Sequence, residues 1–202
     1  MNYKGSLEVI CGSMFSGKSE ELIRCLRRAQ FAKQNIMVFK HSLDDRKTIK
    51  HVISHNSTQI EALAIKDPAE ILNLVNEAVS VIGIDEVQFF DLEIINVILK
   101  LVNSGKKVFV AGLDLDFRGV PFGPMPTLMA LSDKTLKLKA ICVICGKDAH
   151  FSQRIVNGHP AKFNDPIILP GAEEYYQARC RNCFEIDIIG YPRSAVNVQT
   201  NL

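Results

Sequence analysis

The residues best suited to chemistry lie near the amino terminus, where residues 12–19 read GSMFSGKS and fit the pattern GxxxxGK[ST]. This segment directly follows an apolar run, residues 7–11, and directly precedes apolar residues at helical spacing. Glycines in such a loop let backbone N–H groups turn toward phosphate oxygens, and the start of the next helix adds the positive end of a dipole. The pattern therefore predicts a phosphate-binding loop made of Gly12, Ser13, Met14, Phe15, Ser16, Gly17, Lys18 and Ser19.

Two residues of this loop have specific roles with a nucleoside triphosphate. Lys18 is expected to neutralise the β- and γ-phosphates, and Ser19 is expected to offer its hydroxyl to Mg²⁺. The alternative is a glycine-rich turn with an exposed lysine, which the strand and helix on either side of the motif disfavour. ATP with Mg²⁺ is therefore the predicted ligand.

A second motif, Asp85-Glu86, comes directly after the apolar run of residues 81–84. The carboxyl ends of strands form the edge at which open α/β sheets bind ligands. Asp85 is expected to hold Mg²⁺ at the ATP site, and Glu86 is the candidate catalytic base. Alone, an Asp-Glu pair is better explained as a solvated strand end. Together with the phosphate loop, the metal-binding and catalytic interpretation is preferred. The same pair could activate water in an ATPase or a hydroxyl in a kinase.

Four of the six cysteines form two CxxC pairs, Cys142 with Cys145 and Cys180 with Cys183. Four thiolates can close a tetrahedral Zn²⁺ site that leaves no position for a reacting ligand, so the metal is predicted to be structural. The pairs are separated by 34 residues, which is longer than in ordinary zinc ribbons and indicates a functional loop tied at both ends by the metal. The remaining cysteines, Cys11 and Cys25, are most simply core residues.

Strands and helices must bring these motifs together. Apolar runs predict strands at residues 7–11, 36–39, 81–84 and 107–112. Helical spacing and capping predict helices at residues 19–33, 68–79 and 92–103, and the polar residues 40–57 are predicted to form a mobile loop. Strands that alternate with helices indicate an α/β fold, with a P-loop NTPase-like parallel sheet flanked by helices.

The character of the sequence changes after residue 138, where cysteine pairs and short β-like runs replace the alternation. We predict an ATP-binding α/β domain at residues 1–138, a small ribbon-like zinc-binding domain at residues 139–189 and a flexible tail at residues 190–202.

Lys and Arg number 24 against 22 Asp and Glu, which argues against binding mainly through nucleic-acid phosphates or anionic lipid. Residues 1–5 lack the features of a secretory signal and no apolar run is long enough to cross a membrane, so we expect a cytoplasmic location.

Four motifs together resemble those of one family. GSMFSGKS at residues 12–19, DEVQFF at 85–90, LDLDFRGVPF at 113–122 and GAEEYYQARCR at 171–181 follow the order and spacing of the zinc-containing type II thymidine kinases, over about residues 7–184. The resemblance implies transfer of the ATP γ-phosphate to the 5′-hydroxyl of thymidine, with deoxyuridine as a further acceptor, in nucleotide salvage. It also implies a zinc-anchored lasso loop over the nucleoside, a homotetramer and feedback inhibition by thymidine triphosphate.

Positions that match the family's motifs receive their roles by resemblance. Glu86 becomes the general base and Asp85 supports the metal, while Lys18 and Ser19 serve the phosphates and Mg²⁺; Arg46 matches a position near the phosphates. The residues implied to line the nucleoside pocket are Met14, Phe89, Leu113, Phe117, Phe122, Gly171 and Tyr176. From the residues alone, the three phenylalanines could equally be ordinary core, and a lone tyrosine is more often a packing residue.

Two other functions compete with this interpretation. A zinc-containing P-loop ATPase acting on nucleic acid would need a second nucleotide-interface motif and a basic tract, and neither is visible in the sequence. A zinc-ribbon interaction module would leave the phosphate loop unexplained. Neither nucleic acid nor a membrane is therefore an expected partner.

Overall fold

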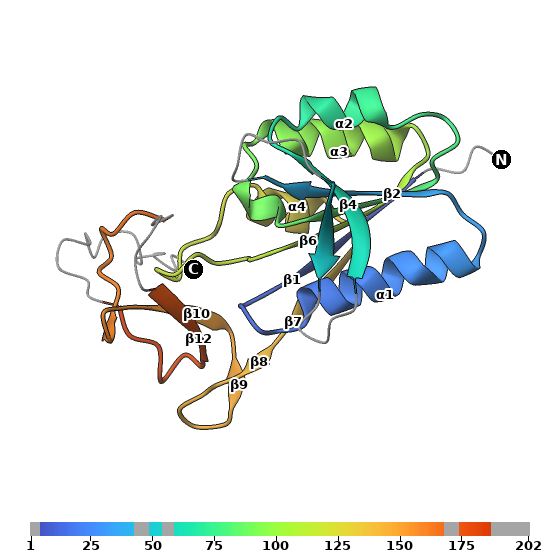
Figure 1. Ribbon diagram of the computed structural model, residues 1–202. Helices are drawn as coiled ribbons and strands as arrows, with labels where there is room; N and C mark the ends of the chain where they lie inside the picture. The colour runs from blue at the N-terminus through green and yellow to red at the C-terminus, as the bar shows by residue number, and fades with distance from the viewer. Residues whose placement is uncertain (1–4, 43–48, 54–58, 168–173, 187–202) are drawn as a thin grey trace, which may run out of the picture.

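The computed structural model describes residues 5–42, 49–53, 59–167 and 174–186. It has two parts: a sheet with helices on both faces, and a smaller part made of short strands (Figure 1). The smaller part lies beside the end of the sheet at which the first helix begins (Figure 1). The sheet and its helices therefore determine where the motifs of the first half of the chain meet.

In the described residues, seven strands form the main sheet in the order β3-β4-β2-β5-β6-β1-β7. Six of them run parallel: β1 Ser6–Gly12, β2 Ile36–His41, β4 Gln59–Ile65, β5 Val81–Asp85, β6 Lys107–Gly112 and β7 Lys134–Leu138. The edge strand β3, Ile49–Ile53, is antiparallel to β4. β5 is buried along its whole length, as is typical of a parallel strand covered on both faces. The predicted α/β fold with a parallel sheet is confirmed.

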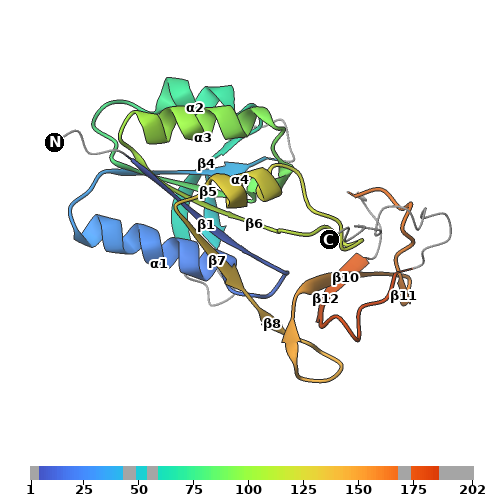
Figure 2. The same cartoon turned by 180° about the vertical axis from the view of Figure 1, so that it is seen from behind.

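Helices cover both faces of the sheet, as Figure 2 shows from behind. α1, Lys18–Phe31, packs on one face through Leu22, Ile23 and Leu26. The opposite face carries α2 Ala69–Leu74, α3 Glu93–Asn103 and α4 Met125–Leu131, together with the short 3-10 helix η1, Val87–Phe89. Each face has its own apolar core, so the strand ends between them are held rigidly. Among the described residues, no helix combines the length and the apolar character that crossing a membrane requires.

Two sequence predictions are wrong in part. Residues 40–57, predicted as a loop, contain the end of β2 and all of β3. β3 is an edge strand, and its lysine and histidine keep its hydropathy too low to signal a strand. The helix predicted at residues 68–79 ends at Leu74, because Val75 is extended and the Asn76 side chain accepts a hydrogen bond from the Ala78 N–H. Val79 is nevertheless buried. Its apolar side chain therefore belongs to the turn that leads into β5 and not to a helix.

The smaller part follows β7 directly. β8, Ala140–Ile141, pairs with β9, Asp148–Ala149, and β10, Phe151–Val156, lies between β11, His159–Pro160, and β12, Glu174–Arg179. β10 and β12 are antiparallel neighbours, with Arg154 opposite Tyr176. The domain boundaries that we drew at residues 138 and 189 stay predictions.

Candidate active site

The phosphate loop connects the carboxyl end of β1 to the start of α1. Gly17 has a left-handed φ of 84° and immediately precedes the helix. Gly12 has a φ of 144°, and a Cβ there would lie 2.4 Å from the carbonyl oxygen of Leu138. Lys18 Nζ donates a hydrogen bond of 2.7 Å to the carbonyl oxygen of Ser13, which folds the side chain back over the loop. Glycine is therefore required at both positions by backbone conformation.

The ammonium group of Lys18 lies close to several carboxylates. Burial lowers the pKa of Lys18 below its ordinary value, whereas the charges of Glu86, Asp85 and Asp114 act in the opposite direction. These three carboxylates come from the ends of β5 and β6. The phosphate loop and the acidic pair therefore belong to one site at one edge of the sheet.

Asp85 ends β5 and is almost completely buried. Ser19 Oγ donates a hydrogen bond of 3.3 Å to Asp85 Oδ2, which joins the first turn of α1 to the end of β5. Burial raises the pKa of the Asp85 carboxyl to about 6, and the neighbouring charge of Glu86 adds to this effect. A buried carboxylate beside a serine hydroxyl is a donor set of the type that Mg²⁺ takes in nucleotide sites.

Glu86 leaves the strand with an unusual backbone. Its φ is 54° and its ψ is 37°, which is the left-handed region that residues other than glycine seldom adopt. The Glu86 N–H donates a 3.0 Å hydrogen bond to Asp85 Oδ1, and the amide of Gln88 contacts the Glu86 carboxylate at 2.6 Å. Strained backbone of this kind is commonly found at functional sites.

The aromatic residues assigned to the nucleoside pocket fall into two groups. Phe89 and Phe122 are half-buried and meet edge to face, with ring centroids 5.5 Å apart. Phe117 is buried beneath the guanidinium of Arg154, which lies 3.6 Å from the ring centroid. Phe117 is thus covered in this structure, while the other two rings keep a surface on which a base could stack.

The other assigned nucleoside residues lie on separate elements. Met14, Leu113 and Tyr176 are each half-buried and come from the phosphate loop, the end of β6 and β12. Gly171 and Arg46, which the resemblance placed at the nucleoside and the phosphates, lie outside the described residues.

Ser152 on β10 joins the smaller part to the phosphate loop. The N–H of Met14 donates a 2.9 Å hydrogen bond to Ser152 Oγ, and Ser13 Oγ donates one of 3.4 Å to the carbonyl oxygen of Ala149. Ser152 was not predicted from the sequence, because nothing in a lone serine signals a contact 138 residues away. The smaller part therefore lies directly against the predicted phosphate site.

Arg154, also on β10, was likewise missed. Its side chain is fully buried, and Nη1 donates hydrogen bonds to the carbonyl oxygens of Pro166 at 2.7 Å and Ile167 at 3.2 Å. The same guanidinium covers Phe117. One residue thus ties the segment after β11 to an aromatic ring of the main part.

The four cysteines of the CxxC pairs come together at one end of the smaller part. The Sγ atoms of Cys142, Cys145, Cys180 and Cys183 all lie within 4.8 Å of one another. Cys145 Sγ and Cys180 Sγ are 3.6 Å apart, close to the roughly 3.8 Å edge of a tetrahedron whose Zn–S bonds are about 2.3 Å. Burial raises the pKa of the Cys142 thiol, but hydrogen bonds from the backbone of Cys180, Ile144 and Cys145 outweigh it and lower the pKa to about 6. The cluster could therefore hold a zinc ion as thiolates.

The other two cysteines differ from each other. Cys11 is fully buried in β1, as predicted for a core residue. Cys25 is only half-buried and donates a long hydrogen bond of 3.7 Å to Glu21 Oε1. The prediction that Cys25 is a simple core residue is thus wrong in part, because its helix face borders a hollow.

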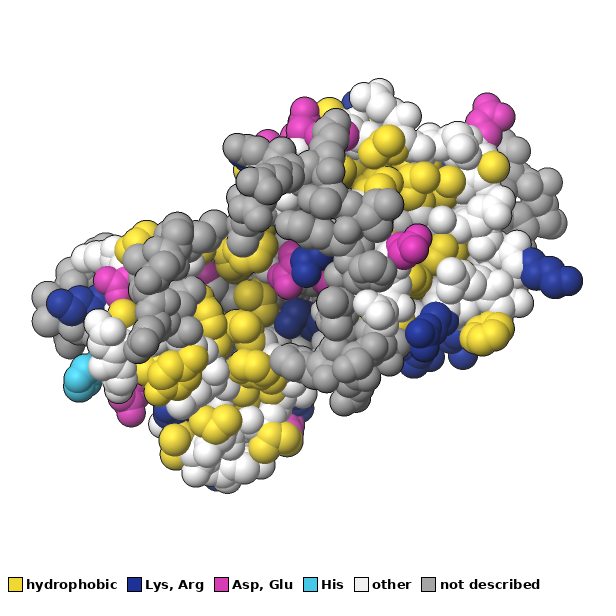
Figure 3. Space-filling model, in the orientation of Figure 1, with side chains coloured by type: hydrophobic (Ala, Val, Ile, Leu, Met, Phe, Trp, Pro, Cys, Tyr) yellow, Lys and Arg dark blue, Asp and Glu magenta, His cyan; other side chains and the backbone are white. Residues whose placement is uncertain are grey.

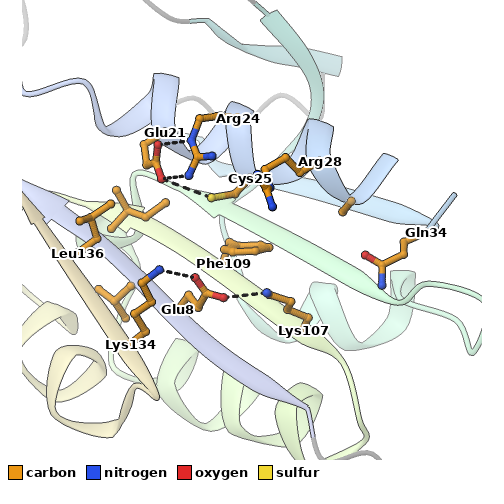
Figure 4. A pocket seen from close by; sticks show the side chains of 13 residues that line it. Glu8, Glu21, Arg24, Cys25, Arg28, Gln34, Lys107, Phe109, Lys134 and Leu136 are labelled. Atoms are coloured by element: carbon orange, nitrogen blue, oxygen red, sulfur yellow. Dashed lines mark hydrogen bonds and ion pairs between the residues drawn. The ribbon is translucent and has the colours of Figure 1, made fainter. Parts of the chain in front are cut away.

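That hollow has a volume of about 460 Å³ and lies between α1 and the outer part of the sheet (Figure 4). Glu8 bridges Lys107 at 2.8 Å and Lys134 at 3.8 Å across its floor, and Arg24 holds Glu21 on the helix side. Neither the phosphate-loop residues nor the four clustered cysteines line it. The hollow is therefore distinct from the candidate active site.

The parallel sheet and the phosphate loop place the protein in the class of P-loop nucleotide-binding proteins. The acidic pair and the cysteine cluster restrict the families within that class to which it can belong. The family model for thymidine kinase matches residues 5–184. The chain belongs to the thymidine kinase family.

Proposed function

We propose that the protein transfers the γ-phosphate of ATP to the 5′-hydroxyl of thymidine, and that deoxyuridine also serves as acceptor. Membership of the thymidine kinase family supports this proposal. The observation that carries it is the meeting of Lys18, Asp85 and Glu86 at one edge of the sheet, because a phosphate site and a proton acceptor must be neighbours for phosphoryl transfer.

The chain's own residues divide the reaction between them. Backbone N–H groups of residues 12–19 and the ammonium of Lys18 bind the phosphates. As the 5′-oxygen of the nucleoside attacks, its bond to the γ-phosphorus forms and the bond to the leaving oxygen of ADP breaks. The hydroxyl proton passes to the carboxylate of Glu86. Phosphoryl transfer needs little covalent chemistry from the protein, so positioning and charge carry most of the catalysis.

Magnesium would be held by Ser19 and Asp85, whose oxygens are 3.3 Å apart. When bound, Mg²⁺ neutralises charge that develops on the β- and γ-phosphate oxygens. Burial of Asp85 keeps its carboxylate oriented toward Ser19. Arg46 is proposed to act near the phosphates by resemblance alone.

The nucleoside would lie between the two parts of the molecule. Phe89 and Phe122 offer aromatic surface for the base, and Met14 and Leu113 lie on the loop and strand end beside it. Phe117, Tyr176 and Gly171 are proposed to complete the pocket, with the zinc-bound cysteines holding a lasso loop over it. A pocket that combines aromatic faces with a few polar groups is the usual form of a small-molecule site.

Four further properties complete the proposal. We propose a homotetramer and feedback inhibition by thymidine triphosphate from the family, and a cytoplasmic location and a structural zinc ion from the sequence. Each can be tested separately from the reaction, by light scattering, by inhibition kinetics, by cell fractionation and by metal analysis.

A nucleoside panel tests the reaction directly. The protein is incubated with ATP, Mg²⁺ and thymidine, deoxyuridine, deoxycytidine or deoxyadenosine, and 5′-monophosphate and free phosphate are both measured, with and without DNA. We expect monophosphate from thymidine and deoxyuridine and little ATP hydrolysis. Hydrolysis stimulated by DNA, without a nucleoside product, would instead support the ATPase alternative.

A further inference from the structure

Gln88 in η1 connects the candidate base to the end of β6. Its side chain is 2% exposed, and Nε2 donates a hydrogen bond of 2.6 Å to Glu86 Oε2. At its other end, Oε1 accepts a hydrogen bond of 3.1 Å from the N–H of Leu113. A single buried amide thus spans the two strand ends between which the reaction is proposed to occur.

The orientation of this amide is set by its partners. The backbone N–H of Leu113 can only donate, so the oxygen of Gln88 must face it. The Gln88 NH₂ group then faces Glu86, whose carboxylate can only accept when ionised. The hydrogen-bond pattern therefore has one consistent arrangement, and it places a donor on the carboxylate.

The surroundings of Gln88 are closely packed. A Cβ at Gly112 would lie 2.6 Å from Gln88 Oε1, and one at Gly123 would lie 2.5 Å from the Gln88 carbonyl oxygen. Glycine at both positions therefore leaves the room that Gln88 occupies beside the end of β6. Val87 in η1 and Phe90 directly after it are buried, so the short helix is anchored on both sides of Gln88.

Glu86 gains its orientation from this anchor. Its left-handed backbone turns it out of the strand, and its carboxylate would otherwise choose among several rotamers. The bond to Gln88 occupies Oε2, and in the described part of the chain Oε1 accepts no hydrogen bond. We propose that Gln88 is a positioning residue, which fixes the Glu86 carboxylate so that Oε1 faces the nucleophilic hydroxyl. This inference rests on the proposed function, because it assigns Gln88 a role only if Glu86 is the base.

The test replaces the amide with a side chain of similar length that cannot donate. Gln88→Met is expected to lower kcat roughly 10- to 100-fold, since misplacing a reacting group by about 1 Å can cost about that much. The KM values for ATP and thymidine should stay within about threefold, because Gln88 contacts the candidate general base and neither of the two ligands.

Gln153→Met is the matched control. Gln153 is also a buried glutamine that accepts a backbone hydrogen bond, from Glu185, and it does not contact Glu86. Its kcat should stay within about twofold of wild type.

A double-mutant cycle separates positioning from structural support. In a Glu86→Gln background, Gln88→Met should cause no further loss of kcat, because it acts through the carboxylate that is already removed. A purely structural role would add its full effect in both backgrounds. If Gln88→Met does not fold, Gln88→Leu, which also cannot donate a hydrogen bond, should show the same loss and the same lack of additivity.

The outcomes are distinct from those of the proposed function. Wild-type kcat in a folded Gln88→Met or Gln88→Leu variant, or equal losses in both backgrounds, would overturn the role of Gln88. Failure of the wild-type protein to phosphorylate thymidine would instead overturn the proposed function. Full turnover by Glu86→Gln alone would assign the base elsewhere and remove the premise of the role of Gln88.

Discussion

The edge of the parallel sheet and the cysteine-rich smaller part are held together by different forces. At the sheet edge, the ends of β1, β5 and β6 emerge from two apolar cores that contain many large aliphatic side chains. Around the cysteines of the smaller part, the buried cluster in the described residues is made of small side chains: Ala140, Cys142, Ala149, Ala178 and Cys180. The first region is stabilised by burial, whereas the second depends on its thiolates and on a few buried polar contacts.

The surface of the smaller part agrees with this difference. Ile141, Val143 and Ile144 surround the first cysteine pair and are 63%, 59% and 61% exposed. Figure 3 shows hydrophobic side chains gathered over this end of the molecule. A small unit that leaves such residues outside gains little from apolar burial at this end, so a metal held by the cysteines would add to its stability there. Under the proposed function, the chemistry would lie on a rigid frame, and the part proposed to cover the nucleoside would depend on zinc for its shape.

The largest effect is expected from Glu86→Gln at the sheet edge. The amide keeps the shape and still accepts a hydrogen bond from Gln88, but it removes the proton acceptor. Turnover should fall roughly 10²- to 10⁴-fold, the usual range for a general base, while both substrates still bind. Steady-state kinetics together with calorimetric binding measures the two properties separately. A variant within about threefold of wild type would assign the base elsewhere.

Lys18→Ala should have the next largest effect, because its charge meets the phosphates in the ground state and in the transition state. We expect kcat/KM for ATP to fall roughly 10²- to 10³-fold, as when one preorganised charge donor is removed. Lys139→Ala is the control, since it breaks only an exposed ion pair with Asp148 and should change little. Unchanged kinetics in Lys18→Ala would contradict the phosphate-loop assignment.

Arg154→Met probes the boundary between the two regions and should have a smaller effect. It removes the hydrogen bonds to Pro166 and Ile167 and the cation over Phe117. Loss of charged hydrogen bonds of this kind predicts a rise of about tenfold in the KM for thymidine. The KM for ATP should stay nearly constant, and Arg154→Lys, which keeps the charge, should lie between wild type and Arg154→Met. Equal changes in both KM values would mean that Arg154 supports the whole fold and not the nucleoside side alone.

The sequence predicted those features that are encoded by neighbouring residues. The phosphate loop follows from GSMFSGKS between a strand and a helix, and the cysteine cluster follows from the spacing of two pairs. The sequence did not predict β3, because an edge strand needs little apolar character. It did not predict α4 either, because this short helix has Pro124 as its N-cap and Pro126 in its first turn, and two prolines so close together obscure the helical pattern.

Features that depend on contacts between distant residues were not predictable. Ser152 meets Met14, and Arg154 covers Phe117, only after the smaller part folds against the main part. The choice between core and pocket for Phe89, Phe117 and Phe122 was also open, since a phenylalanine has the same hydropathy in both places. The sequence offered one signal for Gln88, because a glutamine two residues after the candidate base within DEVQFF is polar where its neighbours are apolar.

Calorimetry on a zinc-site variant tests the central claim most directly. Wild-type protein should contain about one zinc ion per chain, and Cys180→Ala should weaken the site by removing one of four ligands. Cys25→Ala, which changes a cysteine outside the cluster, is the matched control. We predict that metal-depleted Cys180→Ala binds thymidine at least about tenfold more weakly, a loss of about 1.4 kcal/mol, while its affinity for ATP stays within about threefold. Intact thymidine binding together with lost ATP binding would contradict the account, because the metal would then support the phosphate site and not the nucleoside side.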